Sequence, residues 1–344
     1  MDMKRKTVYF TAPKQVELRE EFLPALGAED VLVETVCSAI SAGTEMLVYG
    51  GQFPHLFDAH DKVSSHLKYP LAYGYACVGI VRETGKQVDR NWRDKPVFGF
   101  QPHSTHFIAQ TDSLIPAPAS LPAEACSFLP NMETAVNLIQ DAAPILGERV
   151  LVLGQGVVGL LVASLLKEFP LELLVTSDCH ELRRKASLEL GVDNSFDPEL
   201  IVPADEDSSS HTTNHFAYTQ NFDLTFELSG SPYALNNAIA MTMFSGRVVI
   251  GSWYGEKKAP IDLGSLFHRS RIKLISSQVS SIAPELGGRW DKGRRFEVAW
   301  EALKRIQPQK WITHRFPIEK AEEAYQLLDE NPQETIQVLL EYAA

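Results

Sequence analysis

The sequence predicts an α/β protein in which a doubly wound parallel sheet follows a β-rich segment. From Val150 onward, strongly apolar strand-like runs alternate with helix-like runs, a pattern typical of a parallel sheet with helices on both faces. The first 125 residues instead hold short β-like runs that Gly, Pro and Asp interrupt, with few helical stretches. The chain therefore divides into a β-rich part and an α/β part.

The expected parallel strands are VLVL (150–153), LELLVTS (171–177), FDLTFELSG (222–230), GRVVIGSW (246–253) and IKLISS (272–277). The helices expected between them cover 160–169, 181–191, 232–244 and 263–270. A polar, serine-rich stretch at 202–221 interrupts the alternation and is expected to be a surface excursion.

The β-like runs of the first part are VLVETV (31–36), GIVRE (79–83), KPVFGFQ (95–101) and THFIAQ (105–110). The end of the chain holds a basic loop, two expected helices at 296–306 and 319–331, and a final strand at 335–342. This tail is too short to fold alone, so we expect it to return to the first domain. The predicted boundaries are 1–127, 128–280 and 281–344.

Composition excludes several classes of protein. The net charge of −12 disfavours nucleic acid or an anionic membrane surface as the main partner. The four cysteines are scattered without a C-x-x-C pair, which fits a reducing compartment and no disulfide framework. The basic N-terminus lacks the apolar core of a signal peptide, so we expect a cytoplasmic enzyme with a small-molecule substrate.

The run VLVLGQGVVGLLVASLL (150–166) carries no charge, and its glycines suggest a ligand site instead of a membrane span. Gly154, Gly156 and Gly159 have G-x-G-x-x-G spacing between a strand-like and a helix-like run, with Val157 and Val158 inside the motif. In dinucleotide sites such glycines allow a tight turn, approach of the diphosphate and close helix–strand packing. The alternative is tight packing without a ligand.

Asp178 ends the second expected strand, 19 residues after Gly159. A carboxylate there accepts hydrogen bonds from the ribose of NAD and repels the 2′-phosphate of NADP. The alternative is an Asp that caps the following helix. The carboxylate of Asp178 therefore favours NAD. Arg183 and Arg184 follow closely and are able to reach a phosphate, so the sequence leaves NADP open.

Several motifs together resemble the medium-chain dehydrogenase/reductase superfamily. They are SAISAGTE (38–45), YPLAYGYACVGIV (69–81), LGERVLVLGQGVVGLL (146–161), ELSGS (227–231) and VVIGSW (248–253). The resemblance covers nearly the whole chain and implies a GroES-like catalytic domain, a Rossmann domain and a cleft between them. It also implies cofactor contacts at Ser229, Gly251 and Ser252, and a homodimer for which the VVIGSW strand would pair at the sheet edge.

The sequence departs from the zinc-dependent members of this superfamily. Ala42 stands where they carry a cysteine before G-T-D, and Gly74-Tyr75-Ala76 replaces G-H-E. A third ligand, a cysteine, is expected near Pro130-Asn131, and neither of these residues can replace a thiolate. Since a zinc site needs three or four converging ligands, we expect no catalytic zinc. These features look most like zinc-free branches related to bacteriochlorophyllide a dehydrogenase.

Without a metal, a hydroxyl or an imidazole must supply the proton when hydride moves. Thr44 matches the proton-relay hydroxyl of the family, although a turn hydroxyl that bonds local backbone is an equal alternative. Tyr75 is expected to point into the cleft, either for catalysis or to fill the vacated metal pocket. Glu45 is expected to orient its neighbours.

His103 and His106 lie in FQPHSTHF and are further candidates for an acid or a substrate contact. His55, His60 and His66 have loose spacing and are expected to be loop residues. The basic loop 289–295 is expected to be solvated, although its cations have the charge to hold an anionic substrate.

The favoured function is zinc-independent, NAD(P)-dependent hydride transfer between nicotinamide and an alcohol/ketone substrate. Reduction of an activated C=C bond, as in the quinone and enoyl reductases of the same superfamily, is an alternative. A catalytically silent nucleotide-binding protein is another.

Overall fold

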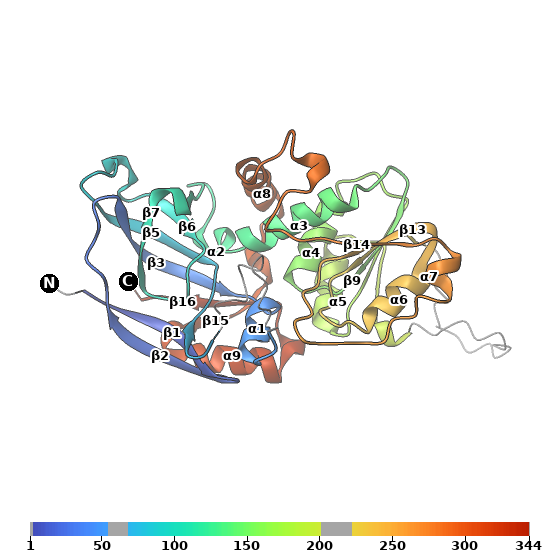
Figure 1. Ribbon diagram of the computed structural model, residues 1–344, viewed down its shortest axis with the longest axis horizontal. Coiled ribbons are helices and arrows are strands. Elements are labelled where there is room, and N and C mark those ends of the chain that lie inside the picture. Colours follow the sequence, from blue (N-terminus) through green and yellow to red (C-terminus); the bar gives the residue numbers. More distant parts are fainter. Residues whose placement is uncertain (1–2, 54–67, 201–221, 344) are drawn as a thin grey trace. The chain divides into compact units, whose positions relative to one another are not determined.

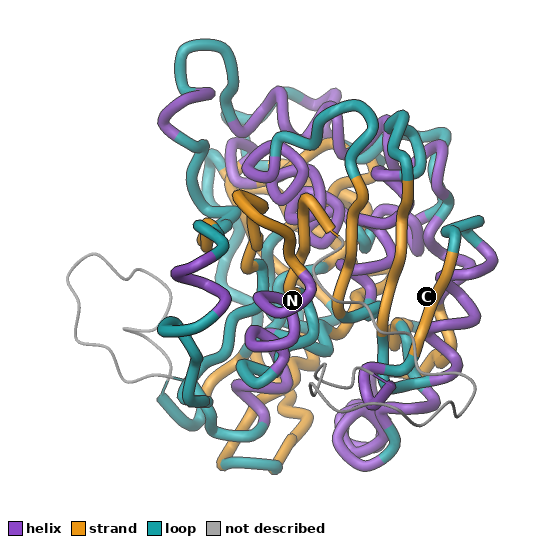
Figure 2. Tube along the Cα trace, turned by 90° about the vertical axis from the view of Figure 1, so that its right-hand side faces the viewer, coloured by secondary structure: helices purple, strands orange, loops and turns teal. Residues whose placement is uncertain are grey.

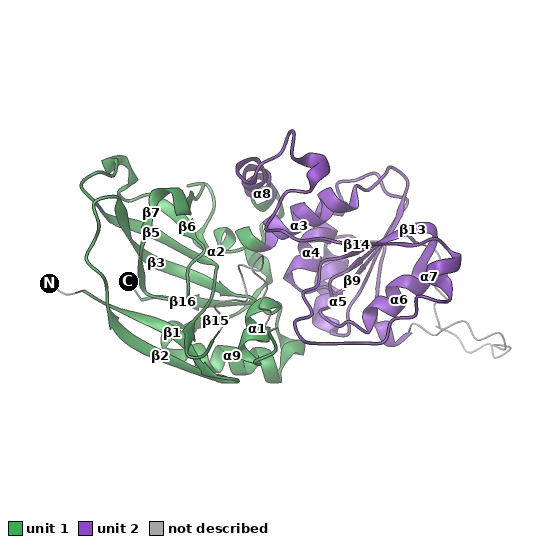
Figure 3. Ribbon diagram, viewed as in Figure 1, with its two compact units in different colours: residues 1–130, 303–344 green, residues 131–302 purple. Residues whose placement is uncertain are grey.

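The structure, a computed structural model, describes residues 3–53, 68–200 and 222–343 of the 344-residue chain. The chain forms two compact units, which Figure 3 colours separately. Unit 1 comprises Met1–Pro130 and Leu303–Ala344, and unit 2 comprises Asn131–Ala302. Both combine helices with strands, as Figure 2 shows. The expected excursion at 202–221 and the histidines at 55, 60 and 66 fall outside the described residues.

Unit 2 contains a six-stranded sheet in the order β11-β10-β9-β12-β13-β14 (Figure 1). Its strands are β9 (Arg149–Leu153), β10 (Leu173–Ser177), β11 (Asn194–Phe196), β12 (Phe222–Glu227), β13 (Thr242–Ile250) and β14 (Lys273–Ser276). Every pairing is parallel, which confirms the predicted parallel sheet. Strand β11 was not predicted because its three residues, NSF, are too few to show a period.

The helices of this unit are α4 (Val157–Leu166), α5 (Glu181–Glu189), α6 (Ala234–Met241) and α7 (Leu266–Arg269), with α3 (Leu129–Ala142) and α8 (Lys292–Ile306) mainly in it. The strand order runs outward from β9 in both directions. Because crossovers between parallel strands are right-handed, α4 and α5 cover one face and α6 and α7 the other. Leu151, Val175, Phe222 and Val248 are buried in the core of this unit.

One expectation about the sheet edge is wrong. The VVIGSW strand is β13, and it lies between β12 and β14 instead of at the edge. The cause is the following run IKLISS, which pairs with it in parallel from Arg247–Lys273 to Ile250–Ser276. The edge strands of the described sheet are β11 and β14, and β14 is the one next to β13.

Unit 1 is built from two sheets. A three-stranded sheet has the order β2-β1-β4, and a larger sheet has the order β15-β16-β3-β5-β6-β8 with β7 paired to β3. The strands are β1 (Lys4–Ala12), β2 (Gln15–Phe22), β3 (Asp30–Ile40), β4 (Leu71–Ala72), β5 (Cys77–Thr84), β6 (Pro96–Gly99), β7 (His106–Gln110), β8 (Leu114–Pro116), β15 (Ile312–Pro317) and β16 (Gln337–Glu341). All pairings are antiparallel except that of β15 with β16.

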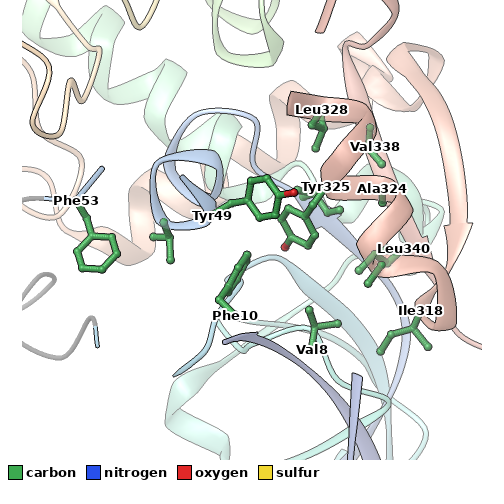
Figure 4. Close-up of a cluster of buried hydrophobic side chains, with 13 residues drawn as sticks. Val8, Phe10, Tyr49, Phe53, Ile318, Ala324, Tyr325, Leu328, Val338 and Leu340 are labelled. Carbon is green, nitrogen blue, oxygen red and sulfur yellow. The ribbon is translucent and has the colours of Figure 1, made fainter. Parts of the chain in front are cut away.

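The C-terminal segment supplies part of the core of unit 1. Helix α9 (Ala321–Glu330) places Tyr325 against Phe10 of β1 and Tyr49 of α1 (Thr44–Tyr49), with ring centroids 5.1 and 5.5 Å apart (Figure 4). Unit 1 also contains the short helix α2 (Ala123–Cys126). The C-terminal segment that completes unit 1 begins at Leu303, so residues 281–302 belong to unit 2. The predicted domain boundaries at 127 and 280 stay a prediction.

No helix within the described ranges is long and apolar enough to span a bilayer.

Candidate functional site

The glycine-rich turn joins β9 to α4 in unit 2. A Cβ on Gly154, whose φ is +91°, would lie 2.5 Å from the backbone carbonyl of Leu228, and one on Gly159 would lie 1.9 Å from the carbonyl oxygen of Gly154. The packing of the chain itself therefore requires these two glycines. Gly156 differs, because its backbone is extended (φ −66°, ψ −174°) and a Cβ there would meet nothing within 4 Å.

Gly156 is also the N-cap of α4, and no side chain caps this helix. The N–H groups of Val157, Val158 and Gly159 have no acceptor within the helix by its geometry. An uncapped helix N-terminus attracts anions, since its free N–H groups and its dipole both favour negative charge. The start of this ten-residue helix therefore combines free N–H groups with open space beside Gly156.

Asp178 directly follows β10, and its carboxylate shapes the glycine turn. One oxygen accepts the backbone N–H of Gln155 at 2.7 Å, and the other accepts that of His180, next to α5, at 2.8 Å. The side chain is buried, and the nearest guanidinium nitrogen of Arg183 lies 4.0 Å away. Arg184 instead donates to the Asp178 carbonyl and to Asp197. Asp178 and Arg183 thus lie together beside the turn.

Two loops after β12 and β13 adjoin the same edge of the sheet. The Gly251 N–H donates to the Glu227 carbonyl at 3.0 Å, and the Gly230 N–H donates to the Ser252 hydroxyl at 2.9 Å. Glu227, opposite Leu153 in the register, accepts hydrogen bonds from Ser229. The carboxyl ends of β9, β12 and β13 meet here, next to the point where the strand order reverses and where ligands of such sheets bind.

Sequence reasoning missed Glu227 and its partner Tyr254. The carboxylate of Glu227 is fully buried, and the Tyr254 hydroxyl donates to it. Burial and the charge of Glu227 raise the pKa of Tyr254. The acidic residue that ends the run FDLTFE in an expected strand was the available signal.

The stretch Ser41–Glu45 of unit 1 begins α1 with a reciprocal hydrogen-bond pattern. The Thr44 N–H donates to the Ser41 hydroxyl at 3.3 Å, and the Glu45 carboxylate accepts the Ser41 N–H at 3.0 Å. This arrangement resembles a capping box, shifted by one residue, and it fixes the turn. Glu45 is fully buried, whereas Thr44 is partly exposed.

Tyr75 joins this group of polar side chains from the segment before β5. The hydroxyls of Ser41 and Thr44 lie close enough to that of Tyr75 to lower its pKa. Burial and the charge of Glu45 raise the pKa of Tyr75 to about 12, although the two hydroxyls act in the opposite direction. The Tyr75 hydroxyl is therefore protonated at neutral pH and able to donate a proton. The structure brings Thr44, Tyr75 and Glu45 together.

His103 belongs to the same group but is fully buried. Its Nε2 lies 2.8 Å from a Glu45 carboxylate oxygen and its Nδ1 lies 2.6 Å from the Ser38 hydroxyl. Both ring nitrogens are thus occupied. Gly74 leaves room for this ring, since a Cβ there would lie 2.6 Å from His103 Cδ2.

His106 lies elsewhere in unit 1, on β7 opposite Glu34 of β3. Its Nδ1 is 3.2 Å from the Thr105 hydroxyl. Burial lowers the pKa of His106, and the charge of Glu34 opposes this shift. The structure therefore does not bring His106 together with Thr44 and Tyr75.

The basic loop before α8 has a structural use. Arg295 is fully buried and donates two hydrogen bonds to Glu133 of α3, at 2.9 and 3.1 Å. Lys292 donates to the same carboxylate. Contrary to the expectation of a solvated loop, these two cations hold α8 against α3, because the carboxylate of Glu133 neutralises them.

The positions matched to zinc ligands carry no converging donors. Ala42 offers a methyl group, and Tyr75 offers a phenol that lies close to neighbouring hydroxyls. Across the described ranges, one set of three His, Cys, Asp or Glu side chains is close enough for a metal ion, Asp178 with Cys179 and His180 in unit 2. Within the described part of unit 1, the positions matched to zinc ligands therefore offer no set of three close donors.

Comparison with known proteins agrees with this architecture. Residues 157–291 match the family described as zinc-binding dehydrogenase. The chain is 25% identical to an L-threonine 3-dehydrogenase of Pyrococcus abyssi, over 95% of this chain and 94% of that protein. It is 24% identical to the L-idonate 5-dehydrogenase (NAD(P)(+)) of Escherichia coli K12, over 66% and 60%.

A solved alcohol dehydrogenase of Escherichia coli CFT073, complexed with NADH, has the same fold. The TM-score is 0.74 at 18% identity, over 98% of this chain and 99% of that one. Residues 157–291 are thus similar to the zinc-binding dehydrogenase family, and the whole chain, with its GroES-like β-rich unit and its Rossmann unit, has the alcohol-dehydrogenase-like fold.

Proposed function

We propose that this protein is an NAD(P)-dependent oxidoreductase that transfers hydride between nicotinamide and an alcohol/ketone substrate without zinc. The observation that carries the proposal is Gly156. The protein's own packing does not require a glycine at this position, whereas a diphosphate at the start of α4 does. The NADH complex of the structurally similar dehydrogenase supports the same cofactor class.

A bound nicotinamide would supply or accept the hydride. In the reducing direction, the Tyr75 hydroxyl, with those of Thr44 and Ser41 close to it, would donate a proton to the oxygen that becomes an alcohol. Glu45 holds the turn that carries two of these hydroxyls.

Titration with NADH and with NADPH, followed by fluorescence, and then a screen of carbonyls, alcohols and quinones test this proposal. We expect saturable binding and turnover of carbonyls. Turnover of quinones alone would instead support a C=C or quinone reductase, and binding without any turnover would support a silent nucleotide-binding protein.

We expect the purified protein to contain no stoichiometric zinc and to keep its activity in the presence of a chelator. The reason is that Ala42 and Tyr75 replace two thiolate or imidazole donors, and a zinc site needs three or four. We propose that the chain belongs to a zinc-free branch related to bacteriochlorophyllide a dehydrogenase, whose sequence pattern it resembles. Elemental analysis that finds about one zinc per chain, with activity lost on chelation, would contradict this.

We expect the cofactor to be NAD(H), with NADP(H) bound more weakly, because the carboxylate of Asp178 repels a 2′-phosphate. Asp178→Asn should raise NADPH affinity relative to NADH. Asp178→Ala should in addition weaken both, since Gln155 and His180 lose their acceptor. The ratio of dissociation constants for the two cofactors is the measurement. An unchanged ratio in both variants would show that Asp178 does not select the cofactor.

We further propose a homodimer. The edge strand β14 presents unpaired backbone groups within the described sheet, and its Leu274 and Ile275 are partly exposed. Pairing of two β14 strands about a two-fold axis would cover them, and closed two-fold dimers are the commonest assembly. Light scattering should give twice the chain mass of 38.3 kDa, whereas a clean 38.3 kDa particle at micromolar concentration would refute the dimer.

A further inference from the structure

A chain of buried hydrogen bonds extends from the candidate proton donors to the last residues of the protein. Glu45, His103 and Ser38 are all fully buried. His103 bridges the other two, at 2.8 Å from Glu45 and 2.6 Å from Ser38. The Ser38 hydroxyl in turn lies 2.6 Å from the hydroxyl of Tyr342, which follows β16. The hydroxyl of Tyr325 in α9 also donates to a Glu45 carboxylate oxygen, at 2.6 Å.

The donor and acceptor roles along this series of hydrogen bonds are fixed. An ionised carboxylate only accepts hydrogen bonds, and Glu45 also accepts the Ser41 N–H, so Nε2 of His103 must carry a hydrogen. A neutral ring then needs a donor at Nδ1, which is the Ser38 hydroxyl. Ser38 accepts in turn from Tyr342. If the His103 ring is protonated at both nitrogens, Nδ1–H donates to the Ser38 hydroxyl, and Ser38 then donates to Tyr342. Nε2–H still donates to Glu45.

This direction excludes His103 as the acid of the site. In either protonation state Nε2 donates to Glu45, and Nδ1 faces Ser38. The fully buried ring has no nitrogen left for a substrate oxygen. Its effect on the candidate donors therefore passes through Glu45.

We propose that His103 is a positioning residue of the candidate active site. Backed by Ser38 and Tyr342, it holds the Glu45 carboxylate against the Ser41–Thr44 turn and so fixes the hydroxyls that deliver the proton. This inference rests on the proposed function. It assigns functional roles to Ser38, the first residue of the SAISAGTE motif, and to Tyr342, which no motif in the sequence indicated.

The electrostatics of Tyr75 give this role a measurable consequence. The groups that act on the Tyr75 hydroxyl are the Glu45 charge and the hydroxyls of Ser41 and Thr44. Tyr73, whose own pKa is raised by burial, lies nearby. The groups that face Glu45 are His103, Tyr325 and the Ser41 N–H. If Glu45 moves away from Tyr75, the pKa of Tyr75 falls. The rate of carbonyl reduction then begins to decline at a lower pH than in the wild type.

The decisive experiment compares His103→Gln with His103→Leu. Glutamine can donate a hydrogen bond to Glu45 but cannot exchange a proton at neutral pH. We expect His103→Leu to lower kcat about tenfold or more, with little change in cofactor affinity. In the same variant, the pKa at which kcat/KM falls on the alkaline side should be lower by about one pH unit. His103→Gln should keep most of the wild-type kcat and an alkaline pKa of kcat/KM close to that of the wild type. Equal loss in the two variants would make His103 the proton-transferring group and overturn the proposal.

A matched pair of serine variants separates positioning from a general loss of stability. Ser38 and Ser187 are both fully buried, and each hydroxyl has a partner at 2.6–2.7 Å. We expect Ser38→Ala to shift the alkaline pKa of kcat/KM and Ser187→Ala, in unit 2, to leave it in place. The same shift in both variants, or in neither, would contradict the proposal.

A measurement without turnover keeps this inference distinct from the proposed function and holds even if His103→Leu fails to fold. Nitrogen-15 NMR of the histidine rings reports which nitrogen carries the hydrogen, and the His103 signals are those lost in His103→Gln. We expect Nε2 to be protonated, with slow exchange. A ring with a bare Nε2 would overturn the proposal, whatever the activity. Absence of cofactor binding with a protonated Nε2 would instead refute only the proposed function.

Discussion

Tyr75→Phe is expected to lower kcat for carbonyl reduction by about 10²–10⁴-fold, or about 3–5 kcal/mol of barrier, while NADH affinity stays unchanged. The change removes one hydroxyl and keeps the ring. That hydroxyl lies close to those of Ser41 and Thr44, and its pKa of about 12 keeps it protonated at neutral pH. Steady-state kinetics and a fluorescence titration of NADH check the two parts separately.

Thr44→Val is the companion variant, because it removes the neighbouring hydroxyl and preserves shape. A large loss in one of the two variants identifies the donor, and a loss in both indicates that the hydroxyls act as a pair. If both variants turn over like the wild type, these assignments are wrong. Since His103 is buried and His106 lies apart, solvent would then be the proton source.

Gly156→Ala is expected to weaken cofactor binding by about tenfold to a hundredfold without changing the free energy of unfolding. A Cβ at this position meets no protein atom within 4 Å, so the fold accommodates it. A bound diphosphate would meet the added methyl group, and overpacking of this kind costs about 1–3 kcal/mol. Cofactor titration and urea denaturation of the same variant measure both quantities.

Gly159→Ala is the control within the same motif. Its Cβ would stand 1.9 Å from the Gly154 carbonyl oxygen, so we expect a loss of stability of about 3 kcal/mol. If Gly156→Ala bound cofactor as tightly as the wild type, the diphosphate would not lie at the start of α4. If it unfolded like Gly159→Ala, the glycine would serve the fold and the central support for the proposed function would be lost.

The sequence predicted the Rossmann unit well because its signals are local. Each buried parallel strand is a short apolar run, and the glycine spacing falls between one strand and one helix. The order of the strands is less local, and the position of β13 was missed for that reason. Nothing in VVIGSW itself tells whether another strand will pair beyond it, since that depends on residues 273–276.

The candidate site of unit 1 was predicted only in part. Thr44, Tyr75 and Glu45 occur in motifs with a family counterpart. Tyr342 and Ser38 are separated by 304 residues and meet only because β16 pairs with β3. Arg295 illustrates the same limit, since only the fold places Glu133 beside it. A charged residue in a polar loop has no sequence signal of a buried partner.

The discontinuity of unit 1 has a consequence for how the protein is made. All of unit 2 lies between the two segments of unit 1, so the ribosome completes it first, and it has every strand of its own sheet. Unit 1 must wait, because β16, which pairs with β3 beside Ser38, is among the last residues to leave the exit tunnel. During synthesis, β3 is able to pair with β5 and β7, but its stretch Cys37–Ile40 lacks β16, and Glu45 lacks Tyr325. A nascent chain that stalls before α9 would carry a finished unit 2 together with an unfinished and aggregation-prone unit 1.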